Sequence, residues 1–424
     1  MISITKTPNN TYYLVGSLIL LAGAIYLKML SNDFQMQWDD QWMVYNSYTK
    51  SGFTFENIKK IFTEFNGGQY APINQLYYVL LHAFFGYDPF WYHLGSLVIH
   101  ICNVILIFFL LKKLLFLSKE FPTEMITRIA FITALLMDVH PFLVEAVAWV
   151  SASKVILYAF FYILALHSYL KFLETNSFKH YLFSLFCFCL SLGCKEQAVT
   201  FPICLLLMDY FIGRNLKSPA VWYEKIIFFV LALAFGLLTI YAQGSMDSFT
   251  HNVGVKYGAN MLYACYGLIE YITKCIVPIN LLYLYPFPEL IGSSISTRFW
   301  INPLIILVVL FSFWEYMKQK SIFFGVAFFL IHILLVLHFL PMSRFAIVAD
   351  RYAYLSSIGA FFIIAILFNH VVAKRIKYYK TIAFAGVLYV LALALYAQER
   401  TAVWKNSSAL KKQIYKFTDQ KSYK

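Results

Sequence analysis

The chain has 424 residues, of which 61% are hydrophobic and only 13% charged, and its formal net charge is +13. Soluble domains carry roughly 25% charged residues, so the composition excludes a soluble globular protein and favours one embedded in a membrane. The positive charge does not indicate nucleic-acid binding, because most of it lies in short segments between apolar runs, where basic residues orient a membrane protein.

Apolar segments near or above the roughly 18-residue spanning length recur along the chain. The first is longer than a signal-peptide core and lacks a clear cleavage site, so we expect a retained anchor. The pattern predicts an all-α, polytopic membrane protein. Its eleven spanning helices are expected near residues 12–30, 89–111, 126–143, 153–173, 179–194, 198–213, 223–242, 300–317, 321–340, 353–373 and 379–397.

Basic residues predict the orientation of this bundle. With the amino terminus inside, the cytoplasmic segments hold 16 Lys and Arg residues and the short outer loops hold 4. This asymmetry is the positive-inside pattern, and it also suits contact with anionic lipids. The outer side is then the periplasm at a bacterial inner membrane, or the lumen of the endoplasmic reticulum in a eukaryote.

Two apolar segments do not fit the simple count. Residues 259–278 are apolar enough to span but carry Glu270 and Lys274, and residues 74–85 are too short. If residues 259–278 crossed, the turn at Lys318 would face outward, against the charge bias. We therefore predict re-entrant or interfacial helices in the outer loops, tolerable where protein or a water-filled cavity covers them.

The first outer loop opens with Trp38-Asp39-Asp40-Gln41, which places two adjacent carboxylates at the membrane surface. Ionisable groups near a membrane are costly unless they are paired or wetted, so a cluster of them indicates a polar cavity. The others also fall at predicted outer ends, whereas a transporter would place such groups near the midplane between internal repeats. They are Asp33, Asp88, Asp138, His140, Glu145, Lys154, Lys195, Glu196, Asp350 and Arg351.

Several short motifs, taken in chain order, resemble those of a known family. After Asp39-Asp40 come Tyr70-Ala71-Pro72-Ile73, Tyr92-His93-Leu94 with His100 and Asn103, Val139-His140-Pro141-Phe142-Leu143-Val144-Glu145 with Trp149 and Lys154, Lys195-Glu196-Gln197, and Asp350-Arg351-Tyr352-Ala353-Tyr354. In this order they resemble the membrane domain of the tetratricopeptide-associated transmembrane O-mannosyltransferases and their bacterial relatives, in the GT-C glycosyltransferase superfamily. The similarity runs from about Asn32 to Trp404. Two departures are Ala71-Pro72 in place of the common Arg-Pro, and the lack of tetratricopeptide repeats, which makes a protein acceptor less assured.

The resemblance implies a GT-C-like bundle with an outward-facing active site. Such enzymes pass a sugar from a polyprenyl-phosphate carrier to a hydroxyl of a protein, lipid or glycan, usually with inversion. Their catalytic acid lies in the first outer loop, which matches Asp39 or Asp40. A carboxylate can accept the proton of an attacking hydroxyl, and repulsion between the two neighbours can raise the pKa of one of them. Alternatively, the pair caps a helix beginning near Gln41.

A phosphate leaving group needs cations at the membrane surface. Arg351 is the first candidate because a guanidinium binds phosphate oxygens bidentately, and Lys195 and Lys154 follow. The candidates for substrate binding are His100, His140, Glu145, Trp149, Glu196 and Asp350. Alternatives remain open: an Arg351–Asp350 surface pair, a self-paired Lys195–Glu196, a packing role for His100, and a helix stop at His140.

The cofactor and domain predictions complete this interpretation. Asp39, Asp40 and Glu145 could hold Mg²⁺ or Mn²⁺, but we expect no required cofactor, and no Gly-rich nucleotide loop is present. Residues 1–397 are predicted to form the catalytic membrane domain, with 31–88 as its first outer loop. Residues 398–424 are predicted to form a short amphipathic tail on the outer leaflet. The alternatives to an enzyme are a transporter or flippase for lipid-linked saccharide, and a non-catalytic scaffold.

Overall fold

The structure, a computed structural model, describes residues 8–244, 257–286, 297–339, 346–374 and 376–422. In this part of the chain, a helix lies in each of the eleven predicted apolar segments. They are α1 (Pro8–Tyr26), α6 (Pro89–Ser118), α7 (Thr123–Val139), α9 (Ser153–Thr175), α10 (Phe178–Cys194), α11 (Phe201–Ile212), α13 (Ile226–Gly244), α15 (Ile301–Phe313), α16 (Lys320–Ile333), α17 (Ala353–Lys374) and α18 (Tyr379–Val403). The predicted all-α membrane fold is confirmed.

The number of spans is a separate question from the number of helices. Six described segments are long and apolar enough to cross a bilayer alone, and a seventh arises if Thr123–Val139 and Pro141–Ala148, bent by 57°, count as one span. Helices α10 and α15 and the segment Lys320–Val336 are apolar but shorter. The count of eleven spans therefore stays a prediction.

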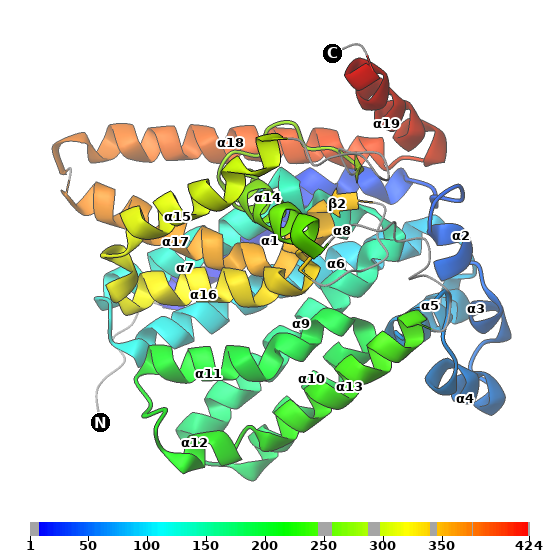
Figure 1. The fold of residues 1–424 in the computed structure, drawn as a ribbon, viewed down its shortest axis with the longest axis horizontal. Helices are drawn as coiled ribbons and strands as arrows, with labels where there is room; N and C mark the ends of the chain where they lie inside the picture. The colour runs from blue at the N-terminus through cyan, green and yellow to red at the C-terminus, as the bar shows by residue number, and fades with distance from the viewer. Residues whose placement is uncertain (1–7, 245–256, 287–296, 340–345, 375, 423–424) are drawn as a thin grey trace.

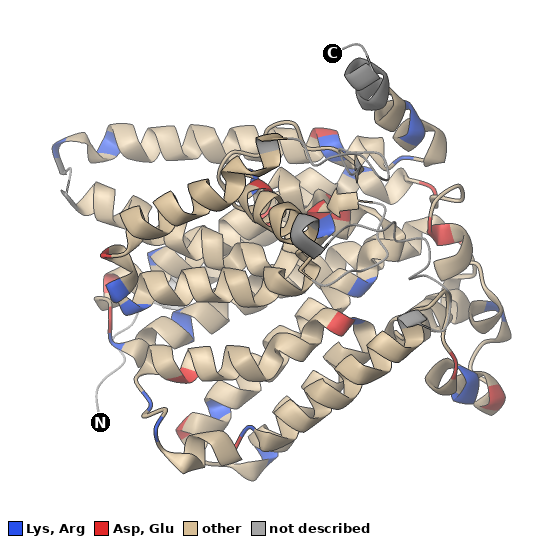
Figure 2. Ribbon diagram, viewed as in Figure 1, with Lys and Arg blue, Asp and Glu red and all other residues tan. Residues whose placement is uncertain are grey.

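The long helices lie roughly side by side, and Figure 1 shows that most of them run along the long axis of the molecule. Between the two ends, long stretches of helix carry no charge, as Figure 2 shows. Helix α9 lies at the centre and is largely buried, whereas α13, α15 and α18 expose most of their apolar side chains. Burial of α9 against α6 and α10 forms the core, and the exposed apolar faces suit contact with lipid.

The predicted first outer loop, which we call the first loop, folds into four short helices at one end of the bundle. They are α2 (Asp40–Met43), α3 (Ser47–Ser51), α4 (Phe55–Thr63) and α5 (Pro72–Phe85). Local chemistry fixes their starts: the side chains of Asn46 and Thr54 accept backbone N–H groups of α3 and α4, and Pro72 occupies the first turn of α5. Residues 74–85, predicted to be interfacial, thus lie within α5.

Helix α14 (Tyr257–Ile276) covers most of the segment predicted to be re-entrant. In Figure 1 it is seen close to end-on, across the direction of the long helices. The turn between α15 and α16, which holds Lys318, lies at the same end of the bundle as α12 (Pro219–Tyr223) and the connection from α17 to α18. This arrangement agrees with a segment that does not cross.

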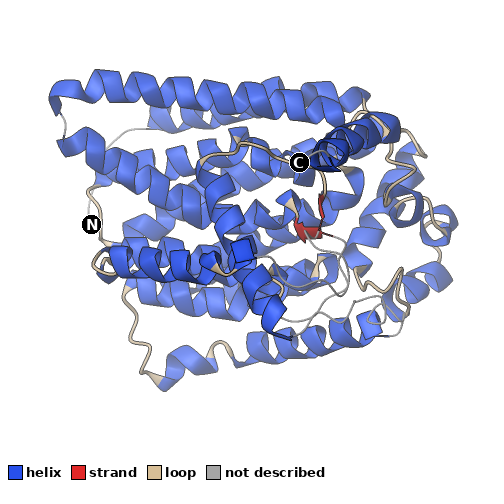
Figure 3. Ribbon diagram, turned by 45° about the horizontal axis from the view of Figure 1, so that its top comes forward, coloured by secondary structure: helices blue, strands red, loops and turns tan. Residues whose placement is uncertain are grey.

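Two short strands and the last two helices complete the described part of the fold. Figure 3 shows the antiparallel pair formed by β1 (Tyr285–Pro286) and β2 (Ala346–Val348) as the strands among the helices. Helix α18 continues to Val403, past the predicted boundary at residue 397, and α19 (Ser407–Ser422) follows. Trp404 and Leu410 are each 1% exposed, so the start of the predicted tail packs against the body.

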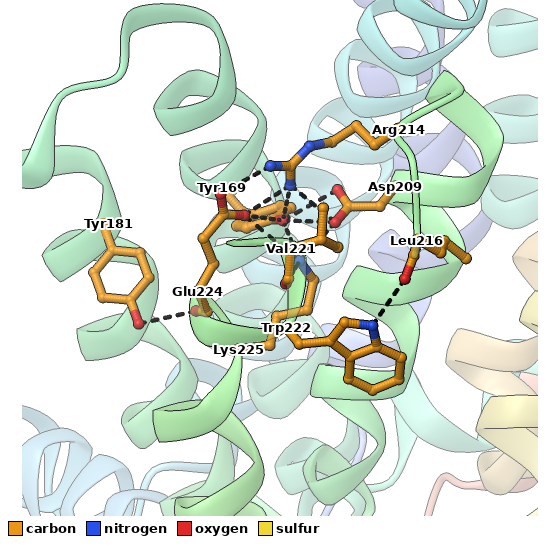
Figure 4. A network of polar contacts seen from close by, with 9 residues as sticks. All are labelled: Tyr169, Tyr181, Asp209, Arg214, Leu216, Val221, Trp222, Glu224 and Lys225. Atoms are coloured by element: carbon orange, nitrogen blue, oxygen red, sulfur yellow. Dashed lines mark hydrogen bonds and ion pairs between the residues drawn. The ribbon is translucent and has the colours of Figure 1, made fainter. Parts of the chain in front are cut away.

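A polar network ties α9, α11 and α13 together at the end opposite the first loop (Figure 4). Lys225 lies 2.6 Å from the Asp209 carboxylate, and Arg214 bridges Asp209 at 2.9 Å and Glu224 at 2.7 Å. The Tyr169 hydroxyl donates to Asp209 at 3.0 Å. Two acids and two bases therefore neutralise one another there.

Candidate active site

Asp39 and Asp40 meet different surroundings. Asp40 is fully buried: its Oδ2 accepts the Gln35 backbone N–H at 2.7 Å, and its Oδ1 accepts the Ser151 N–H at 3.0 Å and also the Ser151 hydroxyl. Asp39 is half-buried and accepts a bond from the Trp42 indole at 3.4 Å. It occupies the N-cap position of α2, but its side chain accepts no capping bond. Asp39 is thus the accessible carboxylate, and Asp40 anchors the loop.

Burial raises the pKa of Asp40 above its usual value, while the hydrogen bonds from Ser151 and Gln35 act in the opposite direction. The charge of Asp39 contributes least to the rise. From the sequence, repulsion between the two neighbours was expected to raise the pKa of one carboxyl group. The pKa of Asp40 is raised, but the main cause is its burial away from water.

Arg351 lies in η8, the 3₁₀ helix Asp350–Tyr352, where neighbouring side chains hold its guanidinium group. It forms an ion pair with Glu145 from α8 (Val144–Ala148), and its guanidinium lies 5.2 Å from the Trp149 ring and 4.8 Å from the Tyr352 ring. The alternative of an Arg351–Asp350 surface pair is wrong, because the partner is Glu145.

Lys195 and Lys154 lie beside Arg351, and we call these three residues the cation cluster. The Lys195 ammonium is 3.3 Å from Glu196 and 5.4 Å from the Tyr352 ring centre. Lys154 donates to the Gln69 side chain at 2.6 Å and interacts electrostatically with both other cations. The three predicted phosphate-binding residues therefore come together around Tyr352.

Asp350 points into a different network. It accepts hydrogen bonds from Arg400 at 2.8 Å and from the Tyr285 hydroxyl at 2.7 Å, and it is fully buried. Arg400 also donates to the Leu281 carbonyl at 2.8 Å. Arg400 is not among the residues predicted from the sequence, because the last helix was expected to end at residue 397. The pattern Gln398-Glu399-Arg400 directly after an apolar segment is the signal that could have identified it.

Two predicted histidines lie away from the cation cluster. His100 is buried between Tyr354, 2.8 Å from its Nδ1, and Asp138, 3.7 Å from its Nε2. His140 is buried, and its Nδ1 accepts the Phe142 backbone N–H at 3.3 Å, which caps a short 3₁₀ turn. Packing and helix termination account for these contacts. Their substrate-binding role stays a prediction without support from their position.

The carboxylates of Asp39, Asp40 and Glu145, which the sequence suggested as metal ligands, do not point to one common site. Glu145 is paired with Arg351, and both oxygens of Asp40 accept hydrogen bonds inside the protein. Among the described residues, no group of three or more His, Cys, Asp or Glu side chains is arranged to hold a metal ion.

The chemistry available here is base catalysis beside a cationic surface. Asp39 can accept a proton, and the cation cluster can bind an anionic oxygen that develops charge. Glu145, Trp149 and Tyr352 hold the Arg351 side chain, while Trp149 also stacks on Trp404 at 5.3 Å. Sequence reasoning missed Gln69 and Ser151, whose roles depend on contacts between distant segments.

Comparisons with known proteins support the expected resemblance. No protein-family model matches the chain. It is 24% identical to "Protein O-mannosyl-transferase F38B6.6" of Caenorhabditis elegans over 421 residues, which covers 93% of this chain and 56% of that protein. It is 28% identical to human "Protein O-mannosyl-transferase TMTC1" over 214 residues, covering 45% of this chain and 23% of that protein. The chain thus spans about half the length of the first relative, and less of the second.

The fold also matches solved structures. The archaeal oligosaccharyltransferase AglB from Archaeoglobus fulgidus, in complex with an inhibitory peptide and a dolichol-phosphate, aligns with a TM-score of 0.50 at 13% identity, covering 93% of this chain and 56% of AglB. The apo form of the A. fulgidus enzyme gives 0.50 at 12% identity, covering 92% and 56%. The resemblance to O-mannosyltransferases and the GT-C-like fold, both expected from the motifs, are confirmed.

Proposed function

We propose that the protein is a glycosyltransferase of the GT-C type that moves a sugar from a polyprenyl-phosphate carrier to a hydroxyl group at the outer face of the membrane. One observation carries the proposal: Arg351 and Lys195 lie 4.8 and 5.4 Å from the Tyr352 ring, with Lys154 beside them. The hydrogen bond from Ser151 to Asp40 holds α2, and with it the accessible Asp39 carboxylate, against the segment that carries Trp149 and Lys154. The names of the two relatives favour mannose as the sugar and a protein hydroxyl as the acceptor. A lipid or glycan acceptor is the alternative.

The reaction is a single displacement. Asp39 accepts the proton of the acceptor hydroxyl, and the freed oxygen forms a bond to the anomeric carbon of the sugar. The bond from this carbon to the phosphate oxygen breaks on the opposite face, so the configuration inverts. Both electrons of the broken bond leave with the polyprenyl phosphate, whose charge the cation cluster stabilises.

The setting of Arg351 suits this role. A guanidinium held by Glu145 and flanked by Trp149 and Tyr352 is oriented before the donor binds, so little side-chain freedom is lost on binding. Glu145 also compensates the charge of Arg351 in the absence of substrate. The dolichol-phosphate and inhibitory peptide described in the AglB complex support a lipid carrier and a peptide acceptor by analogy of fold.

The test is sugar transfer by the purified full chain, supplied with radiolabelled polyprenyl-phosphate mannose and a crude envelope acceptor fraction. Asp39→Asn should reduce the transfer rate roughly 100- to 10,000-fold, the range for loss of a general base. Asp33→Asn, an exposed acid of the same loop, should leave the rate unchanged. If the chain binds the carrier but transfers nothing, the enzyme proposal fails, and a transporter or scaffold becomes the better interpretation.

A further inference from the structure

We propose that the tight turn Asn66–Gln69 of the first loop positions both reactive parts of the candidate active site; this rests on the proposed function. Two positioning residues carry the effect. Trp42, which packs against the turn, acts through the proposed base Asp39, to which it donates a hydrogen bond. Gln69, the last residue of the turn, acts through Lys154 of the cation cluster. The turn thereby links α2 to the start of α9, which is more than 100 residues away in the sequence.

The turn has a closed backbone. Asn66 and Gln69 exchange two backbone hydrogen bonds, each of 3.0 Å, and form an antiparallel bridge. Between them, Gly67 and Gly68 have φ angles of 58° and 70°. Two-residue turns of this kind need positive φ at both central positions, which glycine adopts without steric cost. The backbone that carries the Gln69 side chain is therefore fixed by the turn itself.

Gly67 packs directly against the Trp42 ring. A Cβ atom added at Gly67 would lie 2.6 Å from Cζ3 of this ring, so any other residue would push the ring aside. The Nε1 atom of the same ring donates to Asp39 Oδ1 at 3.4 Å. The turn thus contacts one edge of an indole whose N–H contacts the proposed base. A shift of the ring therefore changes the hydrogen bond to Asp39.

Gln69 holds Lys154 without cancelling its charge. The Gln69 side-chain oxygen accepts a hydrogen bond from the Lys154 ammonium at 2.6 Å. The other two members of the cation cluster each form an ion pair with a glutamate, whereas no carboxylate in the described part of the chain forms one with Lys154. The phosphate diester of the proposed donor is an anion, and a cation whose partner is a neutral amide keeps its charge for it. A carboxylate at position 69 would compete with the phosphate.

The turn adds a second contact to the one between Asp40 and Ser151. The Ser151 backbone N–H donates to Asp40 at 3.0 Å and ties α2 to the segment before α9. A single contact of this kind leaves a short helix free to tilt, and the packing of Trp42 on the turn restricts that tilt. A misplacement of about 1 Å in an active site can reduce a rate about 100-fold, so the spacing between the base and the cations depends on both contacts.

The first experiment compares Gly67→Ala with Gly52→Ala in the purified full chain, with radiolabelled polyprenyl-phosphate mannose and the crude envelope acceptor fraction. Gly52 has a φ of 62° in the same loop, but a Cβ atom added there would meet no atom within 4 Å. Both variants therefore bear similar backbone strain, and only Gly67→Ala displaces Trp42. Gly67→Ala should lower kcat about 10- to 100-fold with a donor KM within about 2-fold of wild type, and Gly52→Ala should change neither.

Trp42→Phe tests the same contact without a change of backbone, so it also decides the matter if Gly67→Ala does not fold. It keeps an aromatic ring beside Gly67 but removes the N–H that bonds to Asp39, and kcat should fall about 5- to 10-fold. Adding Gly67→Ala to Trp42→Leu should lower kcat by less than about 2-fold further, because both changes act through one contact. Fully additive losses would mean that Gly67 does not act through Trp42.

The second experiment separates charge from position at Gln69. Gln69→Glu keeps a hydrogen-bond acceptor for Lys154 but neutralises it, so the donor KM should rise about 10-fold while the acceptor KM stays unchanged. Gln37→Glu adds the same charge at an exposed position of the first loop and should leave both values unchanged. Binding of unlabelled polyprenyl phosphate, which needs no turnover, should weaken about 10-fold in Gln69→Glu as well.

The outcomes separate the turn from the proposed function. Wild-type kcat in Gly67→Ala and Trp42→Phe, with an unchanged donor KM in Gln69→Glu, would overturn the role of the turn and leave the glycosyltransferase proposal intact. Losses of equal size in Gly52→Ala and Gln37→Glu would do the same. An effect in only one experiment would contradict a turn that positions both parts. No transfer by wild type would overturn the proposed function, and the role of the turn with it.

Discussion

Asp39 and Asp40 are adjacent in the sequence, yet helical geometry sends their side chains in different directions. Successive residues of a helix are turned by roughly 100°, so one carboxylate of such a pair can face the body while the other faces the surface. Asp40 takes the inward place and bonds to Ser151 and Gln35, which fixes α2 against the bundle. Asp39 then stays half-buried at the surface, which suits its proposed role as the base for an acceptor hydroxyl.

This difference predicts a pH dependence of stability. The pKa of Asp40 is raised in the folded protein above its ordinary value of 3.8, so its contribution to stability is complete below that value and is lost as the pH rises through the folded pKa. Asp40→Asn removes the titration but keeps one acceptor oxygen. Thermal unfolding of the purified protein should therefore show the wild-type Tm falling relative to that of the variant as the pH rises above the ordinary carboxyl value of 3.8. Parallel curves, or the same slope in Asp33→Asn, would contradict this assignment.

The chemistry of single side chains was predictable from the sequence, but their pairing was not. Arg351, Lys195 and Lys154 gather as expected, because ionisable groups near a membrane must find polar partners. Arg351 pairs with Glu145, 206 residues away, and not with the adjacent Asp350. In a 3₁₀ helix successive side chains are turned by roughly 120°, so neighbours such as these two diverge. Such a partner lies outside what local spacing can reveal.

At the level of helices, apolar patterning predicted where the chain is helical but not how the helices are joined. Arg214 and Lys225 entered the sequence argument only as orientation signals, because a positive charge near a membrane end has that general meaning. In the fold they form a network with Asp209, Glu224 and Tyr169 that joins three helices (Figure 4). The hydrogen bond with Glu224 raises the pKa of Arg214, so its charge persists.

Breaking this network should cost stability. Asp209→Asn leaves the fully buried Lys225 ammonium without its 2.6 Å charge partner, and loss of one partner of a buried pair costs about 3–5 kcal/mol. Glu174→Gln is the matched control: its ion pair with Lys113 is partly exposed, and such pairs contribute about 0–1 kcal/mol. Thermal unfolding in detergent should show a much larger loss for Asp209→Asn. Equal losses would mean that the network does not stabilise the helix contacts.

At the scale of the whole molecule, the first loop and the cation cluster lie at one end of the bundle, and the turn at Lys318 lies at the other. Helix α14, which precedes that turn, does not run along the long helices. The candidate active site is therefore at one end of the bundle only. The basic segments before α12 and between α17 and α18 lie at the opposite end. By the positive-inside rule we expect that end to face the cytoplasm, which places the proposed transfer on the outer side.

Cysteine labelling in intact cells tests this orientation. A membrane-impermeant maleimide should modify Lys50→Cys on α3 from outside, and should modify Lys318→Cys and Lys377→Cys only after permeabilisation. All three positions are exposed, but Lys50 lies at one end of the bundle and the other two lie at the opposite end. Cys189 is exposed in the parent chain, so each variant is made in a Cys189→Ala background, and that background alone is the control. Labelling of Lys318→Cys together with Lys50→Cys from outside would mean that α14 crosses the membrane. Labelling of Lys50→Cys only after permeabilisation, with Lys318→Cys and Lys377→Cys labelled from outside, would instead reverse the orientation, and the side assigned to sugar transfer would have to be revised with it.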